Sequence, residues 1–536
     1  MHEVVDAVVV GGGHNGLVAA NRLADAGWDV VVVEGAHEPG GAVRTAQVTA
    51  PGYLVDLFSA FYPMTAASPV MNSLDLGAHG LAWSHAPTVL AHVRPDQPAA
   101  VLHRDPEATA AALDADQPGD GDEWLELAHR WNSYGRPAMD ALLSPFPPVR
   151  AALRVGWRAR TDLLELARML VLPVRSLAEE RFGGPLPGLL LAGNALHADV
   201  PPEAAPSAML GWLLCGLGQT VGFPVPVGGA ARITDALVGR LSAAGGGLRC
   251  GAPVERVRVE GGRAVGVDSA DGSSLVARRA VIAACDAKIL YTELLQPEDL
   301  PPAFEVGLRR FHRASSTVKI NWAVRAPVPW RDREATAAGT VHVADSLDEL
   351  TQSAAELAMG LVPARPFLLV GQMTTADITR SPEGTESMWA YTHVPQRVLG
   401  DAGGEFGPVD TLAGAALEVV AARMQARIEA HAPGFGDLVV GTTVQGPADL
   451  EAENASLVGG DISGGTSQLH QQLVFRPMPG LARPETPVAG LFLGSASAHP
   501  GGSVHGACGA NAARAAIWHD RARRARRLWG RARTRR

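Results

Sequence analysis

The stretch Val8-Val9-Val10-Gly11-Gly12-Gly13-His14-Asn15-Gly16 decides how the chain begins to fold. An apolar run, a glycine turn and a helix start follow one another here, and this pattern is the fingerprint of a dinucleotide site. Gly11 permits the sharp turn, Gly13 leaves no side chain between the backbone and a pyrophosphate, and Gly16 lets the helix lie close to the sheet. We expect the helix N–H groups and positive dipole end to face the phosphates, with His14 and Asn15 in the same turn.

The residues after the turn continue the same unit. Ala20, Leu23 and Gly27 fit the packing side and the C-cap of a helix, and Asp29 to Val33 is predicted as a second buried parallel strand. Glu34 closes that strand, where a carboxylate can accept hydrogen bonds from ribose hydroxyls and would repel a 2′-phosphate. A glycine loop without a ligand is the alternative. This alternative is disfavoured because the strands, the glycines, the helix and Glu34 all have the spacing that a dinucleotide site requires.

A second glycine loop follows closely, in Pro39-Gly40-Gly41-Ala42-Val43-Arg44-Thr45. Gly40 and Gly41 permit backbone contact with a diphosphate, and Arg44 can neutralise it. The alternative is a surface turn with a solvated arginine. The loop emerges at the carboxyl end of the second strand, where open parallel sheets bind ligands, and this favours the diphosphate.

The composition is that of an ordinary globular chain with more than one domain. Its 536 residues are 47% hydrophobic and 19% charged, with a formal net charge of −9. Nine arginines crowd the last segment: Arg521, Arg523, Arg524, Arg526, Arg527, Arg531, Arg533, Arg535 and Arg536. Without them the rest would carry about −18, and such an acidic body gives no support for nucleic-acid binding.

The four cysteines, Cys215, Cys250, Cys285 and Cys508, form no C-x-x-C pair and no metal quartet. Disulfide reductase chemistry needs two close cysteines, so it is disfavoured, and no metal is expected. Few, scattered cysteines suit a reducing compartment. The N-terminus shows no signal-peptide pattern, and we therefore expect a cytoplasmic location.

The middle of the chain alternates helical and strand patterns. Helical spacing is found in Asp105–Asp114, Glu123–Trp131, Arg160–Leu170 and Arg232–Ala243, and alternating strands in Val254–Val259, Ala264–Val267 and Leu275–Val281. The stretch Ala204–Ala231 carries no charged residue, but its prolines and glycines argue against a membrane span. We interpret it as a buried helix running into a loop. The two alternatives are that it forms the wall of a substrate cavity or a surface that inserts into a bilayer.

A second ligand-facing turn is predicted near the other end. Leu491–Gly494 is predicted as a strand, and it runs into Ser495-Ala496-Ser497-Ala498-His499-Pro500-Gly501-Gly502-Ser503-Val504-His505-Gly506. Ala507–Ile517 is then predicted as a helix, whose start could meet an anion. No second glycine fingerprint of comparable quality appears, so a separate nicotinamide domain is not expected.

Together, these N-terminal and C-terminal motifs resemble the phytoene desaturase-related FAD oxidoreductases. The stretch Val458-Gly459-Gly460-Asp461-Ile462, with Gln471 and Arg476-Pro477, is most similar to the pyridine nucleotide-disulfide oxidoreductase domain-containing protein 2 branch. The resemblance covers nearly the whole chain. It implies an α/β fold, with an FAD-binding Rossmann-like domain of the glutathione reductase/amine oxidase type and an inserted mixed α+β substrate domain.

The resemblance also implies a division of the chain. Residues 1–75, 225–300 and 455–520 would form the FAD-binding domain, residues 76–224 and 301–454 the substrate domain, and residues 521–536 an Arg-rich tail.

Non-covalent FAD would then be bound by both ends of the chain. Glu34 would hold the adenosine ribose, Gly13 and Gly16 the pyrophosphate, and Val254 the adenine through its backbone. Arg44 would lie near the flavin end. The full set of predicted cofactor residues is Gly11, Gly13, His14, Asn15, Gly16, Glu34, Gly40, Gly41, Arg44, Val254, Gly494, Gly501, Gly502 and Val504.

A flavin takes a hydride at N5, so the protein needs no nucleophile or paired carboxylates. The helix starting near Gly506 would stabilise the reduced ring. His499 and His505 flank the expected flavin loop and are the predicted acid–base residues, although each could equally be structural. Lys319 in a strand-like segment could act near N5, as in amine oxidases, but strand lysines are usually solvated. Cys508 is interpreted as a packed small residue rather than a covalent flavin anchor.

These features predict an FAD-dependent oxidoreductase that desaturates, saturates or oxidises a lipophilic, isoprenoid- or carotenoid-like small molecule. Oxygen, a quinone or another acceptor would receive the electrons. One alternative is a flavin amine oxidase, although no obvious aromatic pair precedes His499. The alternative from another class is a non-catalytic prenyl- or lipid-binding protein of the GDP-dissociation-inhibitor type.

The Arg-rich tail, residues 521–536, suggests a further partner. Its arginines could attract anionic lipid headgroups, with Leu528 and Trp529 as apolar contacts, and give a peripheral membrane contact. A disordered, solvated tail is the alternative.

Overall fold

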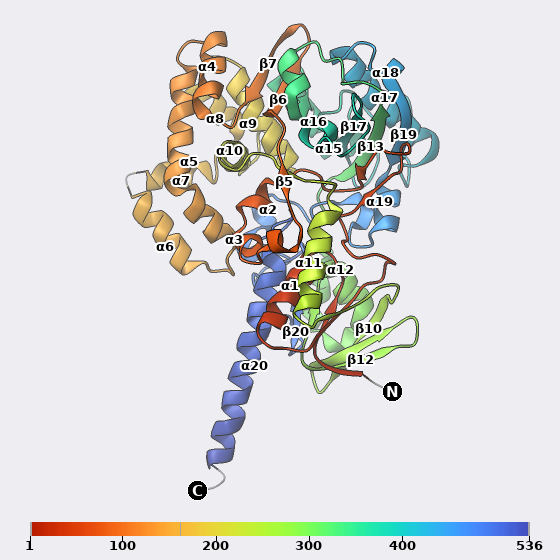
Figure 1. Ribbon diagram of the computed structural model, residues 1–536. Coiled ribbons are helices and arrows are strands. Elements are labelled where there is room, and N and C mark those ends of the chain that lie inside the picture. Colours follow the sequence, from red (N-terminus) through yellow and green to blue (C-terminus); the bar gives the residue numbers. More distant parts are fainter. Residues whose placement is uncertain (1–2, 161, 534–536) are drawn as a thin grey trace.

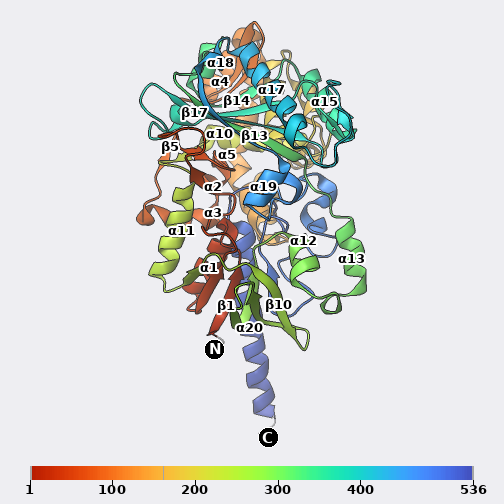
Figure 2. The ribbon, with the colours of Figure 1, turned by 90° about the vertical axis from the view of Figure 1, so that its right-hand side faces the viewer.

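The computed structural model describes residues 3–160 and 162–533. Two large β-sheets form its framework, with helices packed around both of them (Figure 1). The first sheet lies nearer the two termini and the second lies at the opposite end of the molecule, as Figure 2 shows from the side. The predicted α/β fold class is confirmed.

The first sheet has the strand order β10-β11-β12-β1-β2-β9, and β20 also pairs with β12. Strands β12, β1, β2 and β9 are parallel, whereas β10 and β11 form the predicted antiparallel meander. The bounds are β1 Glu3–Val10, β2 Val30–Val33, β9 Gly247–Arg249, β10 Val254–Glu260, β11 Arg263–Ser269, β12 Ser274–Ala283 and β20 Leu491–Leu493.

The parallel strands of this sheet are apolar because both of their faces are covered. The last six residues of β1 and all four of β2 are buried. One face packs on helices α1 (His14–Asp25), α11 (Ala231–Ala243) and α20 (Ala507–Arg533). The other face packs on the meander and on the segment around Leu290 and Tyr291.

Two glycines let the first and last helices lie against their neighbours at backbone distance. A Cβ on Gly16 would lie 2.0 Å from the carbonyl oxygen of Gly11, and a Cβ on Gly509 would lie 1.9 Å from that of Asn15. Both distances are far inside any real contact, so only glycine fits at these two positions. The two ends of the chain therefore meet at the start of α1.

The second sheet has the order β19-β13-β17-β16-β14-β6-β7. All of its pairs are antiparallel except the parallel pair β14·β6. Its strands are β6 Thr88–Arg94, β7 Gln97–Leu102, β13 Ser316–Val324, β14 Ala338–Val343, β16 Leu368–Gln372, β17 Glu386–Val394 and β19 Val439–Gln445. Strands β13 and β17 are buried along their whole length.

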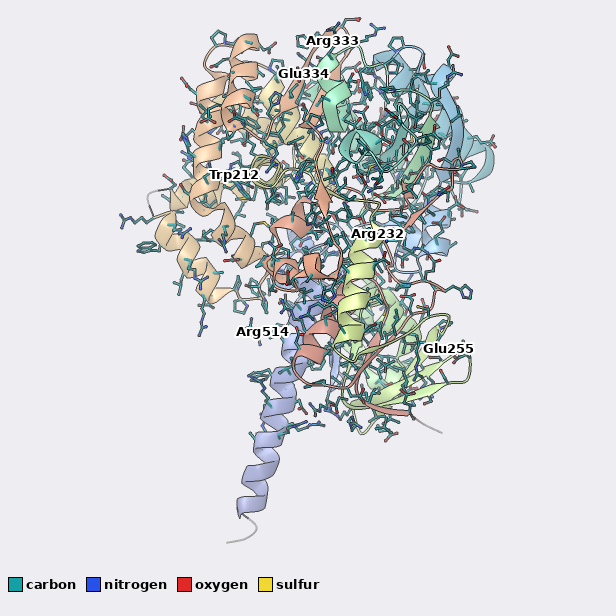
Figure 3. All side chains as sticks on the ribbon, viewed as in Figure 1. Trp212, Arg232, Glu255, Arg333, Glu334 and Arg514 are labelled. Atoms are coloured by element: carbon teal, nitrogen blue, oxygen red, sulfur yellow. The ribbon has the colours of Figure 1, made fainter. Side chains whose placement is uncertain are left out.

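A layer of helices covers one face of the second sheet. It consists of α4 Pro106–Asp116, α5 Asp120–Leu143, α6 Val149–Arg158, α7 Leu163–Met169, α8 Val174–Arg181, α9 Leu186–His197 and α10 Ser207–Thr220. Helices α15 (Leu347–Ala358) and α17 (Gly414–His431) belong to the same half of the chain, and α19 (Pro447–Glu453) follows β19. Figure 3 marks Trp212 of α10 in the helical layer and Arg514 on α20.

The uncharged stretch Ala204–Ala231 contains α10, followed by a loop with the short strand β8 (Val225–Pro226). This confirms the interpretation as a buried helix running into a loop. Within residues 3–160 and 162–533, no helix is both long enough and apolar enough to span a membrane.

The domain boundaries derived from the sequence stay a prediction. The first sheet is assembled from residues 3–33, 247–283 and 491–493, and the second from residues 88–102, 316–394 and 439–445.

The C-terminal helix is longer than predicted. Instead of ending at Ile517, α20 continues to Arg533 and includes most of the expected tail. Arg523 and Arg524 pair with Asp520 one turn earlier, which ties the first part of the tail into the helix. The side chains of Leu528 and Trp529 lie outside the described part of the chain.

We expect the substitution Gly509→Ala to destabilise the protein by at least about 1–3 kcal/mol, because the new methyl group would force α20 away from α1. Gly239→Ala is the matched control. Gly239 also lies in a helix, but no atom stands within 4 Å of its Cβ position, so this change should be neutral or stabilise by up to about 1 kcal/mol. Urea unfolding of both variants measures the difference, and equal stabilities would contradict the close contact.

Candidate active site

The first glycine loop joins the end of β1 to the start of α1. Gly11 has φ +100°, which favours glycine. Gly13 is the N-cap residue of α1, no side chain caps the helix there, and its first turn holds no acidic residue. A Cβ on Gly13 would meet nothing nearer than 3.9 Å. The start of α1 thus carries neither a capping side chain nor a nearby acidic residue, as a phosphate-binding loop requires.

Glu34 lies beside this loop, directly after β2. Its Oε2 accepts a hydrogen bond from the Gly12 N–H at 2.6 Å, and its Oε1 accepts one from the Ala36 N–H at 2.8 Å. Each oxygen keeps a further lone pair. The carboxylate is therefore fixed in place and can still accept bonds from ribose hydroxyls.

The second glycine loop lies against the first. The Gly40 N–H donates to the Gly12 carbonyl at 2.9 Å, and Gly40 and Gly41 both have positive φ, +121° and +56°. Arg44 donates to the carbonyls of Gly41 and Glu453 and stacks over the Phe58 ring at 5.2 Å. Within the described residues it has no carboxylate partner, so its charge is available to an anion.

The C-terminal loop closes the same site from the other end of the chain. Thr65 Oγ1 donates to the Val504 carbonyl, and Ser68 Oγ donates to the His505 carbonyl at 2.7 Å. Gly501 has φ +114°, and a Cβ on Gly502 would lie 2.7 Å from the Ser463 carbonyl oxygen. The predicted loop is thus held between N-terminal residues and the segment around Ser463.

A buried arginine supports this loop from behind. Arg476 is fully buried, and its guanidinium donates to backbone carbonyls of Ser463, Gly464, Gly465, Thr466 and Ala496. Arg313 adds a paired charge nearby, because it donates to both carboxylate oxygens of the buried Asp286 at 2.6 and 2.7 Å. These contacts fix the backbone that leads into His499.

The two predicted acid–base histidines have different surroundings. The Ala507 N–H donates to Nδ1 of His505 at 3.0 Å, so His505 caps α20, and burial together with neighbouring His14 lowers its pKa to about 3. His499 Nε2 contacts the Ser144 carbonyl at 3.1 Å, and its buried Nδ1 has no partner among the described residues. Burial lowers the pKa of His499 as well. Of the two, His499 keeps a nitrogen free for proton exchange.

The structure also shows the surroundings of Gly494, Val254 and Cys508. Gly494 packs between β12 and α20, because a Cβ there would lie 3.2 Å from Ile282 and 3.1 Å from Ala512. Val254 begins β10, next to Pro253, which contacts Gly35. Burial raises the pKa of Cys508 to about 11, which fits a packed thiol.

The residues present fit a dinucleotide. His14 Nε2 and Asn15 Oδ1 are buried at the first turn of α1 without a partner in the described residues. Burial also lowers the pKa of His14 to about 4, so its ring is neutral. Unpartnered buried polar atoms and an uncapped helix start are what a bound diphosphate would complete.

A buried ion cluster joins this site to the second sheet. The fully buried Arg380 donates to Asp56 Oδ2 and Asp377 Oδ2, both at 2.9 Å. Asp56 also accepts from the Ala230 N–H and from Thr45 Oγ1, next to Arg44. Sequence reasoning missed this cluster, because its members are far apart in the chain.

Lys319 is not solvated, and the interpretation of it as an ordinary strand lysine was wrong. Strand β13 lies inside the sheet between β19 and β17, and Lys319 is only 3% exposed. Its Nζ donates to the carbonyls of Asp56 and Phe58 and lies 5.6 Å from the Trp389 ring centroid. Burial lowers the pKa of Lys319 to about 7.

Aromatic residues line the sheet beside Lys319. Trp389 and Tyr391 stack with ring centroids 5.9 Å apart and an interplanar angle of 17°, and Phe61 packs on Trp389 at 6.1 Å. We call Phe61, Trp389 and Tyr391 the aromatic wall. Its signal was the alternation Trp389-Ala390-Tyr391-Thr392-His393, which puts three rings on one strand face.

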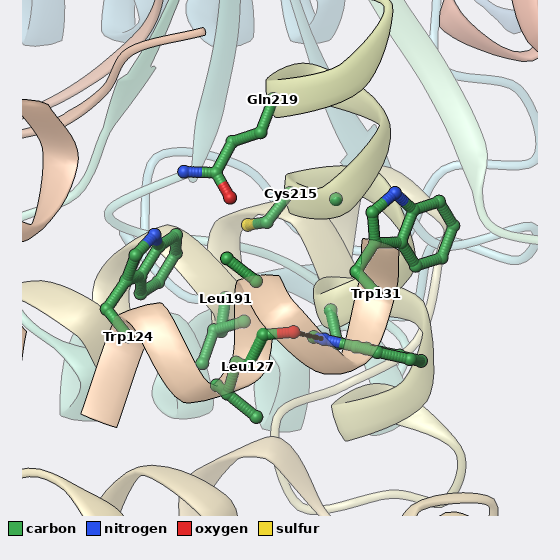
Figure 4. A pocket seen from close by; sticks show the side chains of 9 residues that line it. Trp124, Leu127, Trp131, Leu191, Cys215 and Gln219 are labelled. Carbon is green, nitrogen blue, oxygen red and sulfur yellow. Dashed lines mark hydrogen bonds between the residues drawn. The ribbon is translucent and has the colours of Figure 1, made fainter. Parts of the chain in front are cut away.

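A separate pocket lies inside the helical layer, lined by Trp124, Trp131, Leu191, Trp212 and Cys215, among others (Figure 4). Its volume of about 10 Å³ is at the lower limit for one water molecule. It is therefore packing space and not a substrate site. Within residues 3–160 and 162–533, no cluster of His, Cys, Asp or Glu could hold a metal ion.

The fold and this site define a dinucleotide-binding oxidoreductase, with the cofactor loops at one end of the chain's first sheet. The sequence profile of the family described as "Flavin containing amine oxidoreductase" matches residues 16–362. The chain belongs to this family. FAD is accordingly its cofactor, and the resemblance to phytoene desaturase-related FAD oxidoreductases is confirmed.

Individual relatives extend over most of the chain. The "Pyridine nucleotide-disulfide oxidoreductase domain-containing protein 2" of Rattus norvegicus is 28% identical and covers 95% of this chain and 92% of its own. A "zeta-carotene-forming phytoene desaturase" of Myxococcus xanthus is 27% identical over 73% of this chain and 72% of its own. Among solved structures, a putrescine oxidase variant superimposes with a TM-score of 0.61 at 16% identity, over 98% of this chain and 100% of its own, which shows a shared fold.

Gly13→Leu should abolish FAD binding, because the Cβ position already contacts the second glycine loop at 3.9 Å and a longer side chain would cover the start of α1. We expect purified wild-type protein to carry flavin absorbance near about 450 nm and the variant to lack it. Gly239→Ala, away from the site, should retain the flavin. A fully loaded Gly13→Leu protein would contradict this placement of the diphosphate.

The buried lysine predicts a pH dependence of stability. The pKa of Lys319 is about 7 in the folded state and ordinary in the unfolded state, so between these values the unfolded chain binds more protons and stability rises with pH. The free energy of unfolding of wild type, relative to Lys319→Met, should increase by up to about 4 kcal/mol from pH 7 to pH 10. A difference that is flat or falls with pH would contradict the buried state.

Proposed function

We propose that this protein is an FAD-dependent oxidoreductase that transfers a hydride between the flavin and a lipophilic, isoprenoid- or carotenoid-like small molecule. The observation that supports it is the aromatic wall, which lies beside the Asp56–Phe58 segment that follows the Arg44 loop. FAD, when bound, supplies the hydride acceptor or donor at N5. The protein supplies orientation, a dry surface and a proton site.

The wall offers apolar area without a fixed charge that would select a cation. Trp389 is 5% and Tyr391 8% exposed, and both belong to the apolar core shared with the helical layer. Lys319 stands over Trp389 and can hold or release a proton at Nζ near neutral pH. A lipophilic chain stacked on these rings would be desolvated and held at the edge of the cofactor loops.

Two buried polar residues, His393 and Thr317, lie on the same two strands as Lys319 and the two stacked rings of the aromatic wall. Both ring nitrogens of His393 and the Thr317 hydroxyl are buried without partners in the described residues, and these two residues pair across β13 and β17. Burying such groups is costly unless something bonds them. We propose that they meet an uncharged oxygen of the substrate or an ordered water beside it.

The amine oxidase alternative gains one observation, because the stacked Trp389–Tyr391 pair supplies an aromatic pair that the sequence near His499 did not show. The buried Lys319 beside Trp389 is a second observation of this kind, since amine oxidases use a buried lysine near N5. The non-catalytic lipid-carrier alternative is disfavoured by the FAD cofactor. The electron acceptor is proposed to be oxygen, a quinone or another acceptor, and the location cytoplasmic.

Anaerobic mixing of the FAD-loaded protein with phytoene, with a total lipid extract and with putrescine tests the substrate class. We expect the lipid-derived compounds either to bleach the oxidised flavin or to re-oxidise flavin that has been reduced beforehand, and putrescine to do neither. Trp389→Leu should slow bleaching by about tenfold or more, because it removes the stacking face but keeps the position apolar. Rapid reduction by putrescine, with peroxide released in air, would establish the amine oxidase instead.

A further inference from the structure

An unusual apolar surface lies on α6, α7 and the residues just after them. Val149, Leu153 and Trp157 of α6 are 57%, 68% and 72% exposed, and Leu164 of α7 is 86% exposed. Within residues 149–171, the large exposed apolar residues are Val149, Leu153, Trp157, Leu163, Leu164, Leu170 and Val171. We call it the α6–α7 patch. A contiguous exposed apolar patch is uncommon on a soluble protein and marks an interaction site, whereas scattered exposed apolar residues are normal.

Helix α6 is amphipathic, but its large apolar side chains face solvent instead of the protein core. Val149, Leu153 and Trp157 stand four residues apart, so they form one stripe along α6 that points to solvent. Arg150, Arg154 and Arg158 have the same spacing and form the neighbouring stripe, one residue further round the helix. The inward side of α6 is carried by the buried Ala151 and the partly buried Val155. A helix that only covered the protein core would have its large apolar stripe inward.

The charge of this segment also departs from that of the rest of the chain. Residues 149–171 contain five arginines and two acidic residues, in a chain with a formal net charge of −9. Arg154 has one distant contact with Asp140 at 3.9 Å, and Arg168 pairs with Glu180. Within the described chain, Arg150, Arg158 and Arg160 have no ion-pair partner.

We propose that the α6–α7 patch docks the protein on an anionic lipid surface. The apolar stripe would enter the boundary between headgroups and acyl chains, and the arginine stripe beside it would reach the phosphates. In Figure 1, α6 and α7 lie at the outer edge of the helical layer, and the patch side chains on them are exposed to solvent. The docking does not depend on which substrate the active site takes.

A second copy of the chain is a poorer occupant. A two-fold interface places the same patch on both sides, so it would bring together two segments that each carry five arginines and only two acidic residues. Like charges in an interface oppose association, whereas anionic headgroups complement them.

Co-sedimentation of the full-length, FAD-loaded protein with vesicles tests this proposal. We use phosphatidylcholine vesicles with and without roughly one third phosphatidylglycerol. Wild type should bind the anionic vesicles, and Leu153→Ser/Trp157→Ser/Leu164→Ser should lower the partition coefficient by about tenfold or more. Met359→Ser/Val440→Ser is the matched control, because these two residues are 58% and 51% exposed elsewhere, and it should bind like wild type. Flavin absorbance reports that each variant is folded.

Two further variants separate the sources of binding. Arg150→Gln/Arg154→Gln/Arg158→Gln should weaken binding to anionic vesicles and leave any binding to neutral vesicles unchanged. Replacing the arginines of 526–536 with Gln tests the C-terminal segment. If that change abolishes binding while the triple serine variant binds normally, the tail is the contact and the patch proposal is wrong. Absence of wild-type binding, or a wild-type dimer that the triple serine variant converts to monomer, would also overturn it.

Discussion

The fully buried Arg380 guanidinium, shared between the carboxylates of Asp56 and Asp377, sets the relation between the two sheets. Each charge is out of water and is stable only because its partners are in place. The Asp56 carboxylate also accepts hydrogen bonds from Thr45 Oγ1 and from the Ala230 N–H. The backbone carbonyl of Asp56 accepts a hydrogen bond from Lys319 of the second sheet. Removing one member would leave buried charges uncompensated, which costs about 3–5 kcal/mol.

The active site is built around what this cluster brings together. Cofactor loops from both ends of the chain supply glycines and N–H groups, whereas the second sheet supplies Lys319 and the aromatic wall. The histidines nearby are neutral because burial lowers the pKa values of His14 and His505, and Lys319, with a pKa of about 7, can gain or lose a proton near neutral pH. The protein's contribution to hydride transfer at such a site is orientation and exclusion of water.

The sequence predicted those parts of the site that depend on residues close together in the chain. The glycine loop, Glu34 and the meander strands are short-range motifs, and the structure has them where they were expected. Lys319 was misjudged because sheet order decides whether a strand is an edge, and that order depends on pairing with distant strands. Likewise, Asp56 and Arg380 are 324 residues apart, and no short-range pattern links them. The tail was expected to be separate because its arginines suggest solvent, but α20 simply continues through them.

The contact of Gly509 with Asn15 has a consequence for how the molecule is made. During synthesis β1 and α1 leave the ribosome well before α20. The nascent N-terminal unit must therefore wait, without this covering helix, until the chain has been translated beyond Gly509. A chain that stopped before Gly509 would lack α20 and would leave the N-terminal glycine loops without this covering helix.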